Sequence, residues 1–437
     1  MHLVMNRLKL IKQYILALLQ KSLVRDTIWM VLSQGVGVFI QVGYFILIAR
    51  ALDAASYGAF ISVAAVATII FPFVGLGSGN ILIKNVSRVR ELFGEHWGNA
   101  LSISLGTGVL AILILLASSS FLFPANLSLL AITLLLAADL IGLRLLELAS
   151  SAFVAVSQVK MAAQFKMLYN LSKLVAAITL ITFFKNPGIL TWSILYCIST
   201  ILPAALSLLL IHRSVGKPTL ALTKFKPEFI QGFLFSVDAS AANINANLDK
   251  AMLANLAGLQ VAGIYGAGYR FIDICYYIIF AVASATYTRF FQHGTAGIKG
   301  SFIFAKKLIP IALLYGVVTT TSLFLLAPII VPLMLGKEYL DSIEVLRWMS
   351  PIHLMSSIQF LAADILTGAG FQGSRSAIQV TAAFLNFGLN FWLIPIFSWK
   401  GSACATLTSE ALKTLGLWLV VAYFYRQQIA KSKIADK

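Results

Sequence analysis

Charged side chains occur inside long apolar stretches of this sequence, and they are the first candidates for chemistry. An ionisable side chain in hydrocarbon is costly, so it usually faces a partner or a water-filled cavity. The ionisable residues within such stretches are Asp139, Arg144, Glu147, Lys173, Asp238, Asp249, Lys250, Arg270, Asp273, Asp364, Glu410 and Lys413. These residues therefore mark the places where a ligand could meet the protein.

Some of these charges have a partner three residues away on the same predicted helix, where the two side chains are neighbours. The pairs are Arg144 with Glu147, Arg270 with Asp273, and Glu410 with Lys413. Such pairs can neutralise one another or serve a ligand, and the spacing alone does not decide between the two. Asp238 and Asp364 have no such partner. Together with Asp273 they are our candidates for a proton or sodium site.

The stretch 229–250 is unusually polar for an apolar segment. Ser240, Asn243, Asn247 and Lys250 are three or four residues apart, so they share one face of a helix. That face is too hydrophilic for lipid. It predicts a wet cavity at the centre of the protein.

The familiar motifs of soluble enzymes are absent from the sequence. No GxxxxGK[ST], HExxH or GxSxG occurs, and no two histidines have metal-ligand spacing. Cys197, Cys275 and Cys404 lie in apolar runs and indicate neither a disulfide nor a metal site. We expect a protein that is not an enzyme and has no cofactor. Any pumping would draw on a proton or sodium gradient, the membrane potential or the substrate gradient.

The elements that must position these residues are membrane-spanning helices. The sequence is 59% hydrophobic and 11% charged, whereas soluble domains are about 25% charged. At about 20 apolar residues per span, we predict an all-α integral membrane protein. The predicted spans are 27–49, 58–83, 98–122, 127–149, 164–184, 190–211, 229–250, 264–289, 305–330, 343–367, 376–396 and 402–425. Phe71-Pro72, followed by three glycines, predicts a kink or joint in the second span.

Lysines and arginines are concentrated in alternate loops. One set of loops carries Lys84, Arg88, Arg90, Arg213, Lys217, Lys224, Lys226, Lys306 and Lys307, and the other carries only Arg50, Lys185, Lys337 and Lys400. The positive-inside rule then places the basic loops and both termini in the cytoplasm. This bias explains the net charge of +17 without nucleic acid.

The predicted spans form two halves of equal topology. Residues 27–211 form the first half and 229–425 the second, joined by a cytoplasmic loop at 212–228. Residues 1–26 form either an amphipathic helix on the membrane surface or a basic tail, and 426–437 form a cytoplasmic tail. Ile48–Leu52 with Tyr57–Ala59 is weakly echoed by Leu253–Ala257 with Tyr265–Ala267. Repeated halves of this kind are a standard transporter layout.

Several segments, in this order, resemble the polysaccharide or O-antigen flippases (Wzx type) of the multidrug/oligosaccharidyl-lipid/polysaccharide exporter superfamily. They are Ala49–Leu52, Tyr57–Phe60, Asn247–Leu253, Ala262–Tyr265, Ala267–Arg270, Gly336–Tyr339, Trp399–Ala403, Ala405-Thr406 and Ser409-Glu410. The resemblance covers essentially the whole chain. It implies two pseudo-symmetric six-helix lobes around a central cavity that opens alternately to each side.

The resemblance also implies a substrate, a membrane and partners. The substrate would be a lipid-linked oligosaccharide on undecaprenyl diphosphate, moved from the cytoplasmic to the outer leaflet of a prokaryotic cytoplasmic membrane for cell-surface polysaccharide such as lipopolysaccharide. Membrane lipids and polysaccharide-assembly proteins would be its partners. On this hypothesis the diphosphate meets four cations and the sugar hydroxyls meet two amides. The cations are Arg144, Lys173, Lys250 and Arg270, and the amides are Asn243 and Asn247.

Two other functions are compatible with this hydropathy. An ion-coupled drug antiporter of the same superfamily would need a cavity dominated by carboxylates, whereas cations are at least as prominent in these spans. A membrane polysaccharide polymerase would need a sizeable external loop with catalytic residues, and the predicted loops are short. A lipid-linked oligosaccharide flippase is the preferred hypothesis.

Overall fold

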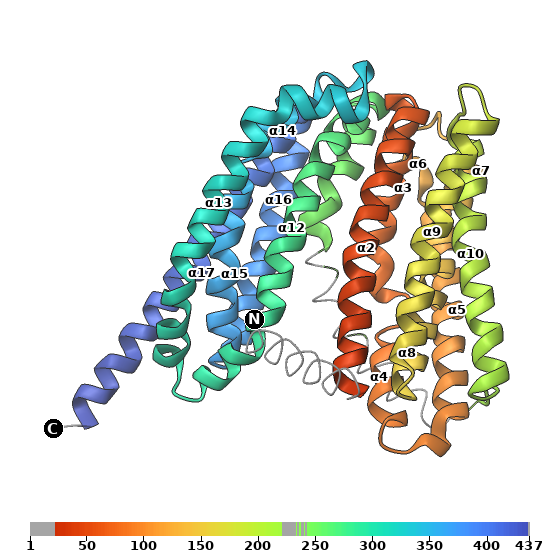
Figure 1. Cartoon of the computed structure of the whole chain (residues 1–437). Coiled ribbons are helices and arrows are strands. Elements are labelled where there is room, and N and C mark those ends of the chain that lie inside the picture. The colour runs from red at the N-terminus through yellow and green to blue at the C-terminus, as the bar shows by residue number, and fades with distance from the viewer. Residues whose placement is uncertain (1–21, 221–232, 234–235, 237–239, 241–242, 436–437) are drawn as a thin grey trace, which may run out of the picture.

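The computed structural model of this protein is a bundle of long helices (Figure 1). It describes residues 22–220, 233, 236, 240 and 243–435. No strand occurs in that part of the chain. The predicted all-α class is therefore confirmed. The N-terminal tail (residues 1–21), most of the central loop and Asp238 lie outside the described residues.

The described residues of the first half form nine α-helices and three short 3-10 or π segments. They are α2 (Ser22–Ala51), α3 (Ala54–Ile70), η1 (Phe71–Phe73), α4 (Ser78–Val86), η2 (Arg90–Leu92), α5 (Phe93–Ala117), α6 (Ser119–Leu122), α7 (Leu129–Leu136), η3 (Ala137–Leu143), α8 (Arg144–Ala155), α9 (Val159–Phe183) and α10 (Ile189–Ser214). The second predicted span is broken between α3 and α4, as Pro72 and the following glycines indicated.

The second half begins with a helical segment at 243–256. It continues with α12 (Leu259–Gly294), α13 (Ile298–Leu335), η4 (Lys337–Tyr339), α14 (Ser342–Met349), α15 (Ile352–Gly368), α16 (Gln372–Phe397) and α17 (Trp399–Ala435). The predicted span 343–367 is divided between α14 and α15. Residues 426–435, predicted as a tail, continue the helix α17.

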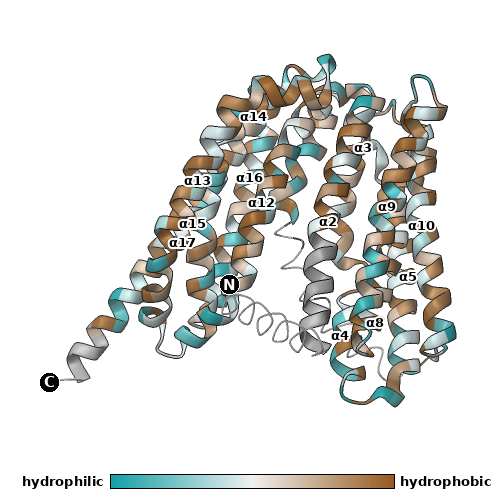
Figure 2. Ribbon diagram, viewed as in Figure 1, coloured by the Kyte–Doolittle hydropathy of each residue, from teal (hydrophilic) through white to brown (hydrophobic). Residues whose placement is uncertain are grey.

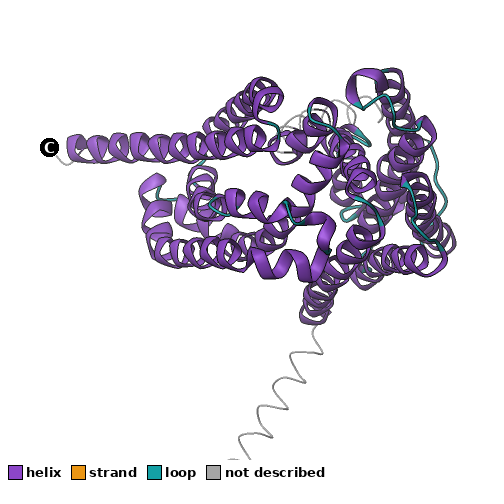
Figure 3. Cartoon of the chain, turned by 90° about the horizontal axis from the view of Figure 1, so that it is seen from above, coloured by secondary structure: helices purple, strands orange, loops and turns teal. Residues whose placement is uncertain are grey.

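The helices form two groups, one from each half of the chain. Helices α2 to α10 contact mainly one another, and so do α12 to α17. The seam between the groups is the contact of α3 with α12. The view along the bundle shows the two groups side by side (Figure 3). We call them the N-lobe and the C-lobe.

Among the described side chains, the hydrophobic core is shared between the lobes at one end of the bundle. At the upper end in Figure 1, buried residues of both lobes form one cluster, which includes Phe45, Tyr57, Tyr265 and Tyr339. At the lower end there are two separate cores. One lies around Trp97 in the N-lobe and the other around Phe290 in the C-lobe. The described side chains therefore form one shared core above and two separate cores below.

The outer surface of the bundle is apolar. Nine helical segments of the described chain are long and apolar enough to cross a membrane, and residues 35–51 form a shorter apolar helix. Apolar residues cover much of the length of the helices, with hydrophilic residues at the lower ends (Figure 2). Large apolar side chains such as Leu314, Phe384 and Trp392 are exposed, as expected for a lipid-facing surface. The protein is a multi-pass membrane protein of about twelve helices.

Candidate functional site

A cavity of about 350 Å³ lies between the two lobes. Its N-lobe wall comes from α2, α3, η3, α8, α9 and α10, and its C-lobe wall from residues 247–250 and α12. The polar residues of the lining are Tyr44, Tyr57, Thr68, Asp139, Glu147, Tyr169, Lys173, Tyr196, Asn247, Lys250, Arg270 and Asp273. Its volume is in the range of small-molecule sites, about 300–1,000 Å³.

The C-lobe wall carries two cations. Lys250 Nζ lies 4.0 Å from the ring centroid of Tyr269 and donates to the Ala246 carbonyl at 2.9 Å. It also lies 3.4 Å from Asn247 Oδ1. Arg270 lies 3.5 Å from Asp273, and about four tenths of its side chain is exposed. Arg270 is thus paired but accessible, whereas Lys250 makes its hydrogen bonds with neutral groups.

The N-lobe wall holds Lys173 inside a cage of tyrosines. Its Nζ lies 4.7–5.1 Å from the ring centroids of Tyr44, Tyr169 and Tyr196, a favourable position for a cation. It also donates to the hydroxyls of Tyr169 and Tyr196 at 3.3 and 3.4 Å. The Tyr196 hydroxyl in turn donates to Asp139 Oδ1 at 2.6 Å. Lys173 and Asp139 are therefore joined through one tyrosine.

Asp139 lies on the π-helical segment η3. Segments of this kind are rare and occur often at functional sites. Directly after it, Arg144 lies 3.7 Å from Glu147, with its guanidinium 5.6 Å from the Phe71 ring. A side chain on Gly75 would collide with Arg144. Arg144 thus packs against the break between α3 and α4, and its partner Glu147 lines the cavity.

Part of the predicted polar face at 240–250 forms hydrogen bonds with α3 rather than lining the cavity. Pro72 has no N–H, so the Thr68 carbonyl lacks its usual helical partner. Asn243 Nδ2 donates to this carbonyl at 2.8 Å, and Ser240 donates to the Ile69 carbonyl at 2.8 Å. Asn247 and Lys250, further along the same face, line the cavity.

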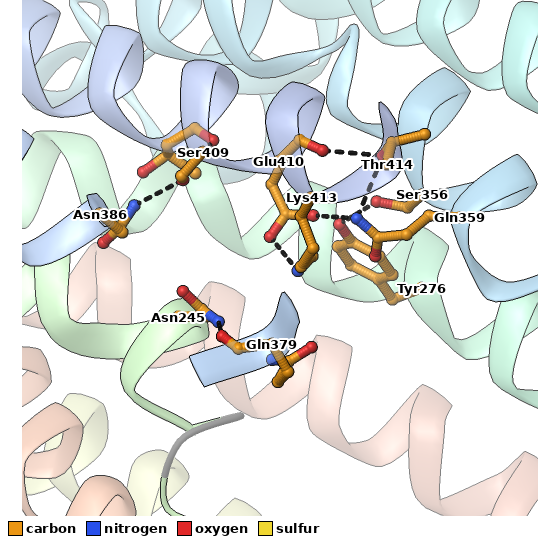
Figure 4. A network of polar contacts seen from close by, with 11 residues as sticks. Asn245, Tyr276, Ser356, Gln359, Gln379, Asn386, Ser409, Glu410, Lys413 and Thr414 are labelled. Carbon is orange, nitrogen blue, oxygen red and sulfur yellow. Dashed lines mark hydrogen bonds and ion pairs between the residues drawn. The ribbon is translucent and has the colours of Figure 1, made fainter. Parts of the chain in front are cut away.

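Another polar cluster lies inside the C-lobe, away from this cavity (Figure 4). Lys413 donates to Glu410 Oε1, and Gln359 donates to Glu410 Oε2 at 2.8 Å. Glu410 and Lys413 are both buried. The two side chains are thus paired with one another, and Gln359 connects this pair on α17 to α15.

Two of the three predicted ion-coupling aspartates, Asp273 and Asp364, lie at different pockets. Asp273 faces the central cavity beside Arg270. Asp364 lies in α15 beside an apolar pocket of about 180 Å³, and its buried Oδ2 has no hydrogen-bond partner in the described part of the chain. Asp238 lies outside the described residues. Ion coupling at these positions stays a prediction.

The structure therefore gathers four of the six predicted substrate-binding residues at one cavity, namely Lys173, Asn247, Lys250 and Arg270. Asn243 and Arg144 are engaged at the α3 break. Sequence reasoning did not assign the tyrosine cage or Asp139 to the site. The sequence could have identified Asp139 as a site residue, because it is a carboxylate within an apolar span and has no charged residue three or four positions away.

The upper end of the cavity is closed by contacts between the lobes. Gly58 of α3 and Gly263 of α12 cross so closely that a Cβ on Gly58 would overlap the Leu259 carbonyl, and one on Gly263 the Ala54 carbonyl. Arg50 Nε donates to the Met334 carbonyl at 2.9 Å. Further contacts join the lobes nearby. Asn255 donates to the Phe121 carbonyl and Tyr339 to the Leu52 carbonyl, and a Cβ on Gly266 would collide with the Ile61 side chain.

Sequence comparison connects the chain to polysaccharide biosynthesis. The family described as "Polysaccharide biosynthesis protein" matches residues 23–293. A protein of Escherichia coli (strain K12) with the name "Putative O-antigen transporter" is 24% identical over 214 residues, which are 48% of this chain and 51% of that protein. The chain thus spans about half the length of this curated relative.

Solved structures with a similar fold are transporters. The lipid II flippase MurJ in an inward closed conformation has a TM-score of 0.75 at 13% identity, over 90% of this chain and 87% of that one. An inward-facing multidrug resistance MATE transporter of the MOP superfamily has 0.73 at 13% identity, over 89% and 96%. An outward-facing MATE transporter has 0.60 at 15% identity, over 93% and 96%.

These findings confirm the resemblance to Wzx-type flippases at the level of family and fold. The fold is that of MOP superfamily transporters. Because the matched region covers more than half of the sequence, the chain belongs to the polysaccharide biosynthesis protein family.

Proposed function

We propose that this protein moves a lipid-linked oligosaccharide, carried on undecaprenyl diphosphate, from the cytoplasmic to the outer leaflet. The observation that carries the proposal is the interlobe cavity, which combines cations with amide and hydroxyl groups. A diphosphate needs positive charge, and a glycan needs hydrogen-bonding groups. The lipid tail of such a substrate can remain in the bilayer. The family and the named relatives support the same substrate class.

The charges of the loops support an orientation in the membrane. The lower-end loops and helix ends carry Lys84, Arg88, Arg90, Arg213 and Lys217, whereas those at the upper end carry Arg50, Lys185, Lys337 and Lys400. By the positive-inside rule the lower end faces the cytoplasm. Both termini are then cytoplasmic, and the membrane is the cytoplasmic membrane of a prokaryote.

The packing of the lobes supports transport by alternating access. The lobes share a core at the proposed outer end and have separate cores at the proposed cytoplasmic end. This arrangement corresponds to an inward-facing state. Rocking of residues 27–211 against 229–425 would separate the α3–α12 crossing and expose the cavity to the outside.

A drug antiporter is the main alternative, since transporters of that class share the fold. The charges of the residues that line the cavity argue against a drug antiporter. Asp273 faces Arg270, Glu147 lies 3.7 Å from Arg144, and Asp139 is joined to Lys173 through Tyr196. Each of these three carboxylates is thus matched by a cation, which leaves little excess negative charge for a cationic drug. We propose a transporter rather than an enzyme.

The proposal is tested by the orientation of lipid-linked glycan in cells depleted of the protein. A glycan-modifying enzyme confined to the outer face serves as the probe. Accumulation of unmodified glycan-lipid in the cytoplasmic leaflet, with continued synthesis, is the expected result. A normal outer pool that is not polymerised would favour a polymerase, and an unaffected pool would favour the antiporter.

A further inference from the structure

The two walls of the central cavity differ in their chemistry. On the C-lobe wall, Lys250 and Arg270 face a single carboxylate, Asp273, so the wall has excess positive charge. On the N-lobe wall, Lys173 is matched by Asp139 through Tyr196 and is surrounded by rings. The charge available to an anion therefore lies on the C-lobe side.

We propose that the cavity divides the substrate headgroup between the lobes, with the diphosphate on the C-lobe wall at Lys250 and Arg270 and the glycan on the N-lobe wall at Tyr44, Tyr196 and Asp139. This inference rests on the proposed function and deepens it. It reassigns Lys173 from diphosphate binding to the support of a glycan subsite.

The N-lobe wall has the groups that a glycan requires. Sugar rings offer apolar C–H faces and many hydroxyls, and the wall offers the aromatic rings of Tyr44, Tyr169 and Tyr196 together with hydroxyl and carboxylate oxygens. Asp139 uses Oδ1 to accept from Tyr196, while its Oδ2 makes no hydrogen bond with a described residue. That oxygen is available as an acceptor for sugar hydroxyls.

Tyr44 provides the independent observation. Its side chain is 6% exposed and lines the cavity, yet its hydroxyl makes no hydrogen bond with any described residue. A buried tyrosine hydroxyl normally finds a partner, and leaving one without a partner costs about 1–3 kcal/mol. The oxygen is shielded from solvent in this structure, so a small movement of the ring toward the cavity would bring it to a sugar hydroxyl at the N-lobe wall.

The position of Arg270 agrees with this order of subsites. Arg270 and Asp273 also line a small space between α2 and α12, which is bridged by Tyr277 donating to Gln41 at 2.7 Å. The diphosphate joins the lipid to the glycan. If the diphosphate lies at Arg270, the lipid lies toward this space between α2 and α12, and the glycan lies toward the N-lobe wall.

The test compares two ligands on the purified full-length protein in lipid nanodiscs. The probes are undecaprenyl diphosphate without sugar and the lipid-linked oligosaccharide extracted from cells that lack the protein. Tyr44→Phe removes a hydroxyl that makes no bond within the described protein, so the fold has nothing to lose. We expect it to weaken binding of the glycan lipid about two- to tenfold and to leave the bare diphosphate lipid unchanged. Asp139→Asn should do the same.

Substitutions on the C-lobe wall should affect the two lipids equally. Lys250→Gln and Arg270→Gln should weaken both lipids by similar factors, because both contain the diphosphate. Tyr423→Phe, the same chemical change on the exposed surface of α17, should change neither. Equal weakening of both lipids by Tyr44→Phe and Asp139→Asn would overturn the division, as would unchanged binding of the bare lipid to Lys250→Gln. If the wild type binds neither lipid, the proposed function itself fails.

Discussion

The side chain of Lys250 makes no hydrogen bond with a carboxylate in the described part of the chain. Its ammonium hydrogen-bonds to a backbone carbonyl and an amide, whereas Arg270 has Asp273 beside it. We predict that Lys250→Gln reduces export of lipid-linked glycan at least about tenfold, the loss expected when a charge-assisted hydrogen bond worth about 1.5–3 kcal/mol is removed. The outer-face probe in cells measures this rate.

The control for Lys250 is another lysine with a surface partner. Lys400 lies 3.3 Å from Glu344, and both are about half exposed or more. Exposed ion pairs contribute about 0–1 kcal/mol, so Lys400→Gln should export at the wild-type rate. Lys250→Arg keeps the charge and should restore most of the export. Full activity of Lys250→Gln at normal protein levels would contradict a role in diphosphate binding.

Single residues show where sequence reasoning succeeded and where it could not. Lys250 and Arg270 stood out because ionisable groups in apolar spans are rare, and both line the cavity. The cage around Lys173 was not predictable, because Tyr44, Tyr169 and Tyr196 come from three helices. Tyrosine is common enough in membrane helices that its type alone gives no signal. Only the packing of α2, α9 and α10 brings these rings together.

The break between α3 and α4 shows that sequence-based prediction has the same limit at the level of helices. The sequence predicted the break from Pro72 and the glycines, and the structure confirms it. The sequence did not predict that Asn243, from the other lobe, donates a hydrogen bond to the Thr68 carbonyl, which lacks a helical partner because of Pro72. That pairing depends on the approach of two segments more than 170 positions apart in the sequence. Asn243 and Ser240 therefore stabilise a joint rather than the cavity wall.

The hydrogen bond between Asn243 and the Thr68 carbonyl leads to a prediction about stability. Asn243→Ala should lower the free energy of unfolding by about 0.6–1.7 kcal/mol, the range measured for side-chain hydrogen bonds within membranes. In a Pro72→Ala background, Thr68 regains a helical N–H partner, so the same substitution should cost less. A double-mutant cycle of thermal unfolding in detergent measures the difference. An equal cost in both backgrounds would contradict the proposed partnership.

The crossing of α3 and α12 makes a second prediction at the level of helices. Gly58 and Gly263 have backbone carbonyls where a Cβ would lie, so Gly58→Ala forces these helices apart. Overpacking of this kind costs about 1–3 kcal/mol. The cost falls on the inward-facing state alone if the crossing opens during transport. We therefore expect the population to shift about 5- to 100-fold toward the outward-facing state.

Gly388 is the matched control for this substitution. It lies in α16, and a Cβ there would meet nothing within 4 Å. Gly388→Ala should leave export unchanged and stabilise the helix slightly. Single-molecule distances between labels on the two lobes would measure the populations for both variants. A Gly58→Ala protein with the wild-type distribution would show that the crossing does not separate.

For the whole molecule, the spans were predictable and the relation between the lobes was not. Hydropathy and the alternating basic loops located the helices because the membrane imposes length and charge rules on each span. The state of the transporter has no such local signal. It depends on which end carries the shared core. The cluster around Tyr57, Tyr265 and Tyr339 lies at one end, and with the proposed orientation this arrangement corresponds to the inward-facing state.

This shared core predicts which side of the membrane reaches the cavity. Thr68 lines the cavity and is exposed, so a cysteine there reports access. In a chain whose three native cysteines are replaced by alanine, Thr68→Cys should react with a membrane-impermeant maleimide in inside-out vesicles and much less in intact cells. Adding Gly58→Ala should reverse this preference, because the closed outer end is the state that the substitution penalises. Labelling from the outer face at equal rates with and without Gly58→Ala would mean that the cavity opens outward by another route than the α3–α12 crossing.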